Sequence, residues 1–351
     1  MTAAAGRGSS SSENAASAAL IHDVDSIFAA YADPRAPGAS VAIIRHGKTV
    51  LSRNYGLADV ETQTPITDRT NFRLASLTKQ FTATAILLLV HDGKLGLDDR
   101  VATILPELPP HSRDVTVRQL LTHTSGLWAY EDFVPDSQTV QVKDRDALAF
   151  LARADSTYFR PGSAFRYSNT GYALLALIVE RRSGQRFARF LHDRIFAPLG
   201  MDSTLAFEAG VSTVPQRAFG YSRGAQNGFR RTDQSNTSAV LGDGGVYSST
   251  HDLALWNRAL DEHTLIDAST QQLAWTPATL SDGRKAAYGF GWFVDQDAFG
   301  LKLWHNGETR GFTNGIAKFP ERGITVIVLT NRSGGAPWDL AAAVAHLASL
   351  E

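Results

Sequence analysis

A serine and a lysine three residues apart are the first feature of this chain that could perform chemistry. Ser76-Leu77-Thr78-Lys79 opens a strongly apolar, helix-like run that continues to Val90 and is closed by Gly93. On a helix this spacing places both side chains on one face, about 5 to 6 Å apart at Cβ. A neutral lysine could take the serine proton, and backbone N–H groups at the helix N-terminus could stabilise an oxyanion. The motif alone is weak evidence for catalysis, because a serine N-cap followed by a solvated lysine has the same sequence.

A tyrosine and an asparagine form the second candidate motif, Tyr167-Ser168-Asn169. Residues two apart in an extended segment point the same way, so Tyr167 and Asn169 would face one cavity. Pro161-Gly162 before the motif and a helical run from Gly171 place it in a loop before a helix, where catalytic groups often lie. The alternative is a tyrosine whose ring only packs on that helix.

A histidine provides the third candidate motif, His305-Asn306-Gly307, in a predicted strand. His305 would share one face of this strand with Leu301 and Leu303. Gly307 would leave room for a substrate to approach the backbone. A single histidine is more often structural than catalytic, so His305 in isolation predicts no function.

The elements that must position these motifs follow from hydrophobic periodicity. Helical spacing runs from Leu20 to Tyr31, and a hairpin follows, with strands 40–45 and 48–54 joined by His46-Gly47. Further helices are predicted at 143–153, 170–182 and 186–196. After residue 285 the pattern predicts four strands and a last helix, at 288–295, 301–306, 313–319, 324–330 and 339–350.

Strands at both ends and helices between them predict an α/β (α+β) fold. One antiparallel sheet would be built from both chain termini and flanked by helices, with a mainly helical region inserted. We expect a single catalytic unit over 20–351, with an α/β region of approximately 20–75 plus 285–351 and a helical region of approximately 76–284. Residues 1–19 are mostly Ala, Ser and Gly, which predicts a disordered leader.

Composition excludes several classes of function. With 34 Lys and Arg against 35 Asp and Glu, the net charge of -1 gives no general attraction for nucleic acid or an anionic membrane. The absence of cysteine removes thiol nucleophiles, disulfides and thiolate metal sites.

We expect no membrane span, because no apolar run approaches the ~20 residues that one needs. No signal-like apolar stretch precedes Leu20, so the chain is cytoplasmic as given, or periplasmic or secreted if an upstream signal was removed.

Together the three motifs, in this order, resemble those of the serine β-lactamase and penicillin-recognising family. The likeness is strongest to its branch of class C β-lactamases, DD-carboxypeptidases and family VIII esterases, because the middle motif is Tyr-x-Asn. The third motif is His-x-Gly in place of Lys-Thr-Gly. The resemblance begins at about residue 22, and further stretches support it: LLTHTSGL at 120–127, Pro161-Gly162, PLGM at 198–201 and GGVYSS at 244–249.

The resemblance implies a role for each matching residue. Ser76 would be the nucleophile, and Lys79 and Tyr167 would be the proton-transfer pair. Asn169 would hydrogen-bond Lys79 or a substrate amide. The backbone N–H groups of Ser76 and Glu308 would form the oxyanion hole. The expected substrate is a small ester, amide, D-peptide or β-lactam, with no cofactor and no metal.

The third motif bears on the choice among these substrates. His305 would replace a lysine as a donor near Tyr167, with a charge that depends on pH. Asn306 and Glu308 stand where penicillin-recognising relatives carry hydroxyl residues that hold a substrate carboxylate. Arg310 could supply a carboxylate partner, but its direction is open. We therefore rank an esterase or D-peptidase above a β-lactamase.

Other readings are weaker. Asp92, Asp98 and Asp99 could suggest a metal, but a surface turn with capping carboxylates is the simpler interpretation. His123 is expected to be structural. A second class of function, a sensor that binds without turnover, is disfavoured because Ser76, Lys79 and Tyr167 are all present. The physiological substrate and the oligomeric state stay open.

Overall fold

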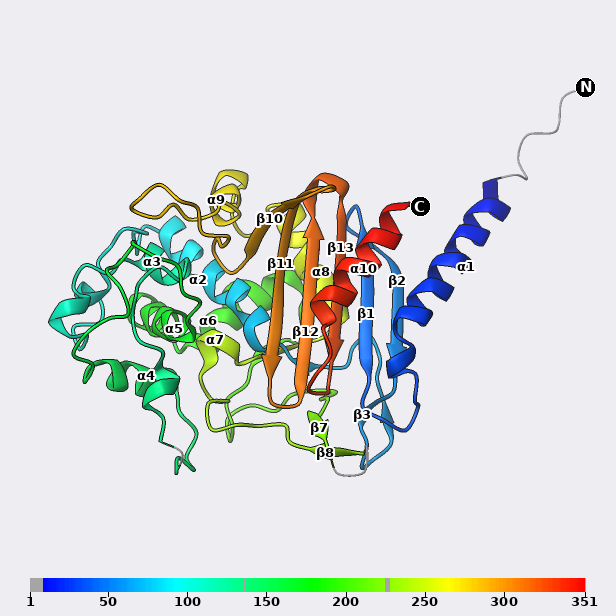
Figure 1. Ribbon diagram of the computed structural model, residues 1–351, viewed down its shortest axis with the longest axis horizontal. Coiled ribbons are helices and arrows are strands. Elements are labelled where there is room, and N and C mark those ends of the chain that lie inside the picture. The colour runs from blue at the N-terminus through cyan, green and yellow to red at the C-terminus, as the bar shows by residue number, and fades with distance from the viewer. Residues whose placement is uncertain (1–8, 136, 225–227, 351) are drawn as a thin grey trace, which may run out of the picture.

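The computed structural model describes residues 9–135, 137–224 and 228–350 and is built around a six-stranded antiparallel sheet (Figure 1). The strand order is β10-β11-β12-β13-β1-β2, so strands from the two ends of the chain pair where β13 meets β1. This confirms the predicted fold class. The strands of this sheet are β1 Ala39–Arg45, β2 Lys48–Tyr55, β10 Phe293–Asp297, β11 Gly300–Thr309, β12 Phe312–Phe319 and β13 Ile324–Thr330.

The boundaries of two strands follow from local turn chemistry. The predicted hairpin between β1 and β2 is confirmed, and both of its connecting residues, His46 and Gly47, have positive φ (48° and 75°), as a tight hairpin turn requires. The strand predicted from residue 288 begins later, at Phe293. Gly291, with φ of 78°, turns the backbone just before it, and strand geometry does not continue through that conformation.

Helices cover both faces of the sheet. Figure 1 shows α1 (Ser9–Ile27) and α10 (Pro337–Leu350) on one face, while α8 (Thr250–Asp261) contacts β1 and β13 from the other. Buried Val24 and Phe28 join Val41 and Val344 in the core of the first face. The expected disordered leader is therefore wrong over residues 9–19, which are helical; alanine-rich sequence favours a helix. Residues 1–8 lie outside the described residues.

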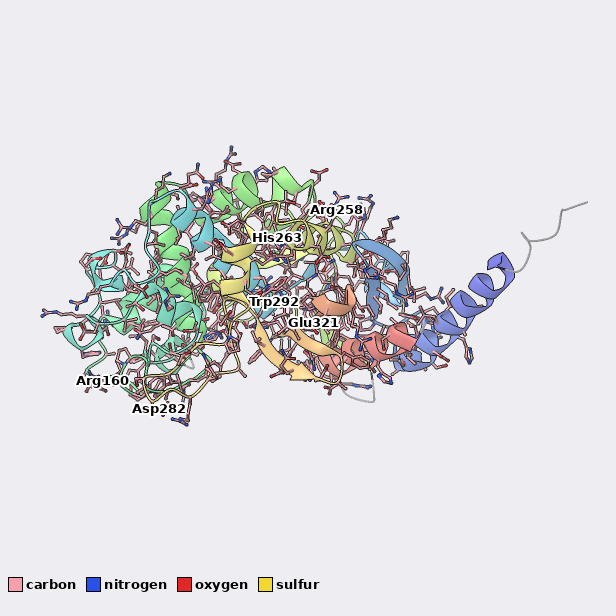
Figure 2. The ribbon with its side chains drawn as sticks, turned by 90° about the horizontal axis from the view of Figure 1, so that it is seen from above. Arg160, Arg258, His263, Asp282, Trp292 and Glu321 are labelled. Atoms are coloured by element: carbon pink, nitrogen blue, oxygen red, sulfur yellow. The ribbon has the colours of Figure 1, made fainter. Side chains whose placement is uncertain are left out.

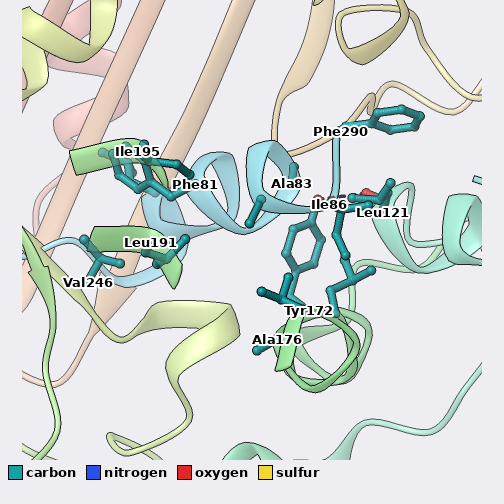
Figure 3. Packing of buried hydrophobic residues seen from close by; sticks show 14 of the residues in the cluster. Phe81, Ala83, Ile86, Leu121, Tyr172, Ala176, Leu191, Ile195, Val246 and Phe290 are labelled. Atoms are coloured by element: carbon teal, nitrogen blue, oxygen red, sulfur yellow. Dashed lines mark hydrogen bonds between the residues drawn. The ribbon is translucent and has the colours of Figure 1, made fainter. Parts of the chain in front are cut away.

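The inserted region is mainly helical, as predicted, and surrounds α2 (Lys79–His91). Residues Lys79 to Leu89 of this helix are all buried. In Figure 3, Phe81 and Ile86 of α2 lie among Tyr172 and Leu191, which come from neighbouring helices. The other helices here are α3 Val117–Leu121, α4 Asp144–Leu151, α5 Asn169–Ser183, α6 Phe187–Leu191, α7 Leu241–Gly244 and α9 Ala268–Ala274.

Short strands and helical turns complete the fold. The strands are β3 Leu57–Asp59, β4 Thr64–Pro65, β5 Phe72–Arg73, β6 Leu205–Ala206, β7 Tyr221–Arg223, β8 Phe229–Arg231 and β9 Val246–Ser248. The turns are η1 Ala29–Tyr31, η2 Ala75–Thr78, η3 Val101–Thr103, η4 Pro110–Ser112, η5 Tyr130–Phe133, η6 His192–Phe196, η7 Ala197–Leu199 and η9 Pro320–Arg322.

Charged side chains lie around the outside of the molecule. Seen from above in Figure 2, Arg160 and Asp282 lie at the end formed by the helical region, whereas Glu321 lies beside the strands. None of the helices described here is both long and apolar enough to cross a membrane.

Candidate active site

Ser76 lies at the junction between β5 and α2, in the helical turn η2. The preceding residue, Ala75, has a φ of 50°, which L-residues with a side chain rarely adopt. This strained residue turns the chain sharply from the strand into the helix. Ser76 is half-buried and lines a cavity of about 100 Å³.

Lys79 is completely buried and points at Ser76. Its Nζ donates hydrogen bonds to Ser76 Oγ at 2.9 Å, Asn169 Oδ1 at 2.9 Å and the backbone oxygen of Asp243 at 2.8 Å. Three acceptors use all three donors of an ammonium group. Loss of one proton would leave a lone pair that can accept the Ser76 hydroxyl proton. The one-face arrangement predicted for Ser76 and Lys79 is present.

Tyr167 and Asn169 both approach Lys79 from the loop that leads into α5. Asn169 makes the hydrogen bond just described, and the centre of the Tyr167 ring lies 5.0 Å from Lys79 Nζ. The Tyr167 hydroxyl oxygen is buried and has no hydrogen-bond partner within the described residues. The second sequence motif therefore lies at the lysine, with a phenol hydroxyl that has no partner among the residues the structure describes.

Four aromatic rings surround Tyr167. Its ring centre lies 4.3 Å from that of His123, 6.0 Å from those of Phe293 and His305, and 6.1 Å from that of Tyr288. We call these five side chains the aromatic wall. They come from the loop after α3, the loop before α5, and strands β10 and β11 with the segment before them.

His305 is a neutral member of the aromatic wall. It is fully buried; its Nδ1 lies 2.6 Å from the backbone oxygen of Asn306 and its Nε2 2.9 Å from the Tyr288 hydroxyl oxygen. A carbonyl only accepts, so Nδ1 carries the proton and Nε2 accepts from Tyr288. Burial, with a smaller effect of the Lys79 charge, lowers the pKa of His305 to about 3. The expected pH-dependent charge near neutrality is therefore wrong, because the ring is cut off from water.

Gly307 serves a purpose other than the one expected. A Cβ on this residue would lie 2.2 Å from the backbone oxygen of Leu74, so the space beside it is filled by protein and not by a substrate. The missing side chain lets β11 pack directly against the segment that leads into Ser76. Ser76 and Glu308 consequently line the same cavity, as the predicted oxyanion hole requires.

A second group of side chains at the cavity was missed by the sequence analysis. Glu131 Oε1 accepts a hydrogen bond from Asn169 Nδ2 at 2.7 Å, whereas its Oε2 is buried and without a partner within the described residues. The hydroxyl of Tyr130 donates to Asp243 Oδ2 at 2.9 Å. We call Lys79, Asn169, Glu131, Tyr130 and Asp243 the polar wall.

Burial sets the protonation of Asp243 in the polar wall. It raises the pKa of Asp243 to about 7, with the Lys79 charge opposing this shift and the Glu131 charge adding to it. Neither acid belongs to a motif that predicts chemistry. The one available signal was position, because Asp243 directly precedes the GGVYSS stretch and Tyr130-Glu131 follows the LLTHTSGL stretch within a few residues.

The remaining sequence candidates lie elsewhere. Arg310 is exposed in the turn after β11 and lines a separate surface pocket of about 360 Å³. Asp92 pairs with Arg194 at 2.7 Å and Asp98 with Arg118 at 2.8 Å, which fits the surface-turn interpretation. Within the described residues, no group of three or more His, Asp or Glu side chains is placed to hold a metal ion.

Comparison with known proteins adds independent evidence. Residues 24–350 match the profile of the Beta-lactamase family. The chain is 32% identical over 302 residues to penicillin-binding protein 4* of Bacillus subtilis (strain 168), covering 82% of this chain and 66% of that protein. It is 31% identical over 304 residues to a D-aminopeptidase of Gluconobacter oxydans (strain 621H), covering 86% of this chain and 57% of that protein.

The chain thus spans only 57% to 66% of the length of these two curated relatives. A solved structure covers it more evenly. The D-amino acid amidase from Ochrobactrum anthropi SV3, complexed with L-phenylalanine amide, superposes with a TM-score of 0.77 at 26% identity. The superposition covers 94% of this chain and 96% of that one.

Proposed function

The chain belongs to the Beta-lactamase family, and on that premise we propose that it is a serine hydrolase that cleaves small amides and esters through an acyl-enzyme on Ser76. The observation that carries the proposal is the 2.9 Å contact between Lys79 Nζ and Ser76 Oγ, made by a lysine that is completely buried. The alternative interpretation of the sequence was a serine N-cap followed by a solvated lysine. Such a lysine would not be buried.

The chemical steps use Ser76 and Glu308, which line the cavity, together with Lys79 and Tyr167 beside Ser76. Lys79, as the neutral amine, accepts the proton of Ser76 while Oγ attacks the substrate carbonyl. The backbone N–H groups of Ser76 and Glu308 receive the oxyanion. The Tyr167 hydroxyl gives its proton to the leaving amine or alkoxide and regains one from Lys79. Water then enters, loses a proton along the same path, and releases the acid from Ser76.

Substrate choice follows from Glu131, which lines the cavity and has one carboxylate oxygen without a partner within the described residues. Glu131 Oε2 would attract an ammonium group and repel a carboxylate, since a buried charge interacts strongly with its neighbours. Two of the similar proteins are named for D-amino acid substrates, a D-aminopeptidase and a D-amino acid amidase. We therefore assign amides and esters of D-amino acids with a free α-amino group as the substrates of this protein.

A β-lactamase activity is the second candidate, and the site favours it less. β-Lactam antibiotics carry a carboxylate that must be held near the acylated serine. Glu308 occupies the position where a hydroxyl was expected, and Glu131 adds negative charge to the same cavity. A sensor without turnover is disfavoured because the Lys79 contact that activates Ser76 is intact.

A pair of substrates that differ in one charge tests the assignment. D-Alanine p-nitroanilide and N-acetyl-D-alanine p-nitroanilide share the scissile bond and leaving group, and only the first has an ammonium group. We expect kcat/KM at neutral pH to be at least about 10-fold higher for the first, a difference of roughly 1.4 kcal/mol. Equal or better cleavage of the acetylated compound would overturn the substrate class. A chromogenic cephalosporin turned over as fast as the best amide would make the protein a β-lactamase.

A further inference from the structure

His123 is connected to both sides of Tyr167, although the proposed reaction gives it no role. Its backbone oxygen accepts the N–H of Arg166 at 3.0 Å, and its side-chain Nδ1 accepts the N–H of Ser168 at 3.1 Å. The N–H groups of the two residues on either side of Tyr167 therefore both donate to His123. His123 is 2% exposed and has a φ of 58°, a conformation that is uncommon for residues other than glycine.

The imidazole ring of His123 also supports the Tyr167 ring directly. The two ring centres are 4.3 Å apart with an angle of 36° between the planes. Tyr288 packs on His123 at 4.5 Å and Tyr172 at 5.1 Å, so the imidazole is held among three tyrosines. The Tyr167 hydroxyl has no hydrogen-bond partner within the described residues, so its ring depends on such packing for its direction.

The charge state of His123 suits this arrangement. Burial lowers its pKa well below the ordinary value, and the charge of Lys79 acts in the same direction. The neutral ring that accepts at Nδ1 carries its proton on Nε2. Nδ1 therefore remains an acceptor for the Ser168 N–H at neutral pH.

We propose that His123 is a positioning residue that holds Tyr167 and Asn169 against Lys79. The proposal rests on the proposed function and deepens it. Tyr167 lies outside any helix or strand, in the short segment before α5 begins at Asn169. Holding the N–H groups of Arg166 and Ser168 fixes the direction in which the Tyr167 side chain leaves the backbone. It also fixes the point at which Asn169 starts the helix.

Other contacts keep the surrounding loops together without the His123 side chain. The Gly162 N–H donates to the Thr124 oxygen at 2.8 Å, and the Tyr158 N–H donates to the Gly126 oxygen at 2.8 Å. These bonds join the same two segments through backbone atoms alone. Removing the imidazole should therefore loosen Tyr167 while the segments stay docked.

Two variants separate positioning from a general effect on folding. His123→Ala removes the ring and the acceptor. His123→Asn keeps an acceptor on the atom next to Cγ and suits a positive φ. With D-alanine p-nitroanilide, His123→Ala should lower kcat by about 10- to 100-fold, the scale of a small misplacement of reacting groups, with little change in KM. His123→Asn should recover most of that loss.

A Tyr167→Phe background sharpens the test. If His123 acts through Tyr167, adding His123→Ala to Tyr167→Phe should lower kcat by less than about 3-fold, because residues that act as a unit are not additive. Independent, multiplicative losses would overturn the proposal. So would equal kcat in His123→Asn and His123→Ala when both melt within a few degrees of each other.

Hydrogen exchange tests the His123 contact with the Ser168 N–H without relying on activity. The Ser168 amide should lose protection in His123→Ala and regain it in His123→Asn, while the amides of Gly162 and Tyr158 stay protected in both. Unchanged protection of the Ser168 amide in His123→Ala would disprove the positioning role of His123, even if Ser76 were shown to be acylated. Failure of the wild type to form any acyl-enzyme would instead count against the proposed function.

Discussion

The two walls, which meet where the Tyr167 ring lies beside Lys79, differ in the charge of their buried side chains. The polar wall contains the buried Lys79, which contacts the nucleophile. It also contains Glu131, whose Oε2 has no hydrogen-bond partner within the described residues. The aromatic wall contains two buried histidines, His123 and His305, whose pKa values are both lowered by burial. The polar wall thus holds Lys79, which contacts the nucleophile, and Glu131, the group proposed to recognise a charged substrate. The aromatic wall holds Tyr167, the other half of the proton-transfer pair, among neutral rings.

Loss of the proton-transfer pair should give the largest effect. Lys79→Ala on the polar wall and Tyr167→Phe on the aromatic wall should each lower kcat by ~100-fold or more, the usual scale for positioned acid and base groups. Their double variant should cost much less than the product of the two losses. Steady-state rates on D-alanine p-nitroanilide give the comparison, and fully multiplicative losses would mean that the two residues do not share one proton path.

Removing one charge from the polar wall should give an intermediate effect. Glu131→Gln keeps an oxygen that can accept from Asn169 Nδ2 and replaces the unpaired Oε2 with an amide group. The preference for D-alanine p-nitroanilide over its N-acetyl form should fall by about 10-fold, as expected for loss of one partly buried ion pair. Activity on a neutral p-nitrophenyl ester serves as the control. A preference that survives the substitution would place amine recognition elsewhere.

The stability of the two walls should respond to pH in opposite directions. The pKa of Asp243 is raised from 3.8 to about 7, so the folded state binds this proton more tightly, and the associated stability is lost as pH rises through that range. The pKa of His305 is lowered from 6.5 to about 3, so its contribution is present above 6.5 and is lost as pH falls toward 3.

Two substitutions should show separately how each group changes the slope of the free energy of unfolding against pH. Between roughly pH 4 and 6.5 the free energy of unfolding should rise more steeply with pH in Asp243→Asn than in the wild type. In His305→Gln it should rise less steeply or fall. Urea unfolding at a series of pH values measures both changes. Identical slopes in all three proteins would show that neither buried group titrates as the geometry implies.

The sequence was informative where chemistry depends on local spacing. Ser76 and Lys79 meet because three residues on a helix return to the same face, and Tyr167 and Asn169 meet Lys79 because both flank the start of one helix. The sequence also predicted that one sheet combines strands from both ends of the chain, because strand patterns occur at both ends and helical patterns lie between them.

The remaining features depend on contacts between distant segments. His305 is neutral because Tyr288 and Phe293 cover it, and Gly307 is required by the backbone of Leu74. Glu131 reaches the cavity only through the packing of η5 beside the start of α5. Periodicity and spacing along one strand or helix contain no information about such neighbours.

Intact-mass detection of the covalent intermediate tests the central claim most directly. Wild-type protein mixed with a D-phenylalanine ester and quenched in acid within the first turnovers should gain the mass of one D-phenylalanyl group, and peptide mapping should locate it on Ser76. Ser76→Ala should show no adduct and no turnover while keeping its fold, because Ser76 is the hydroxyl that Lys79 contacts and activates. Turnover near the wild-type rate in Ser76→Ala, or an adduct on another residue, would contradict the account.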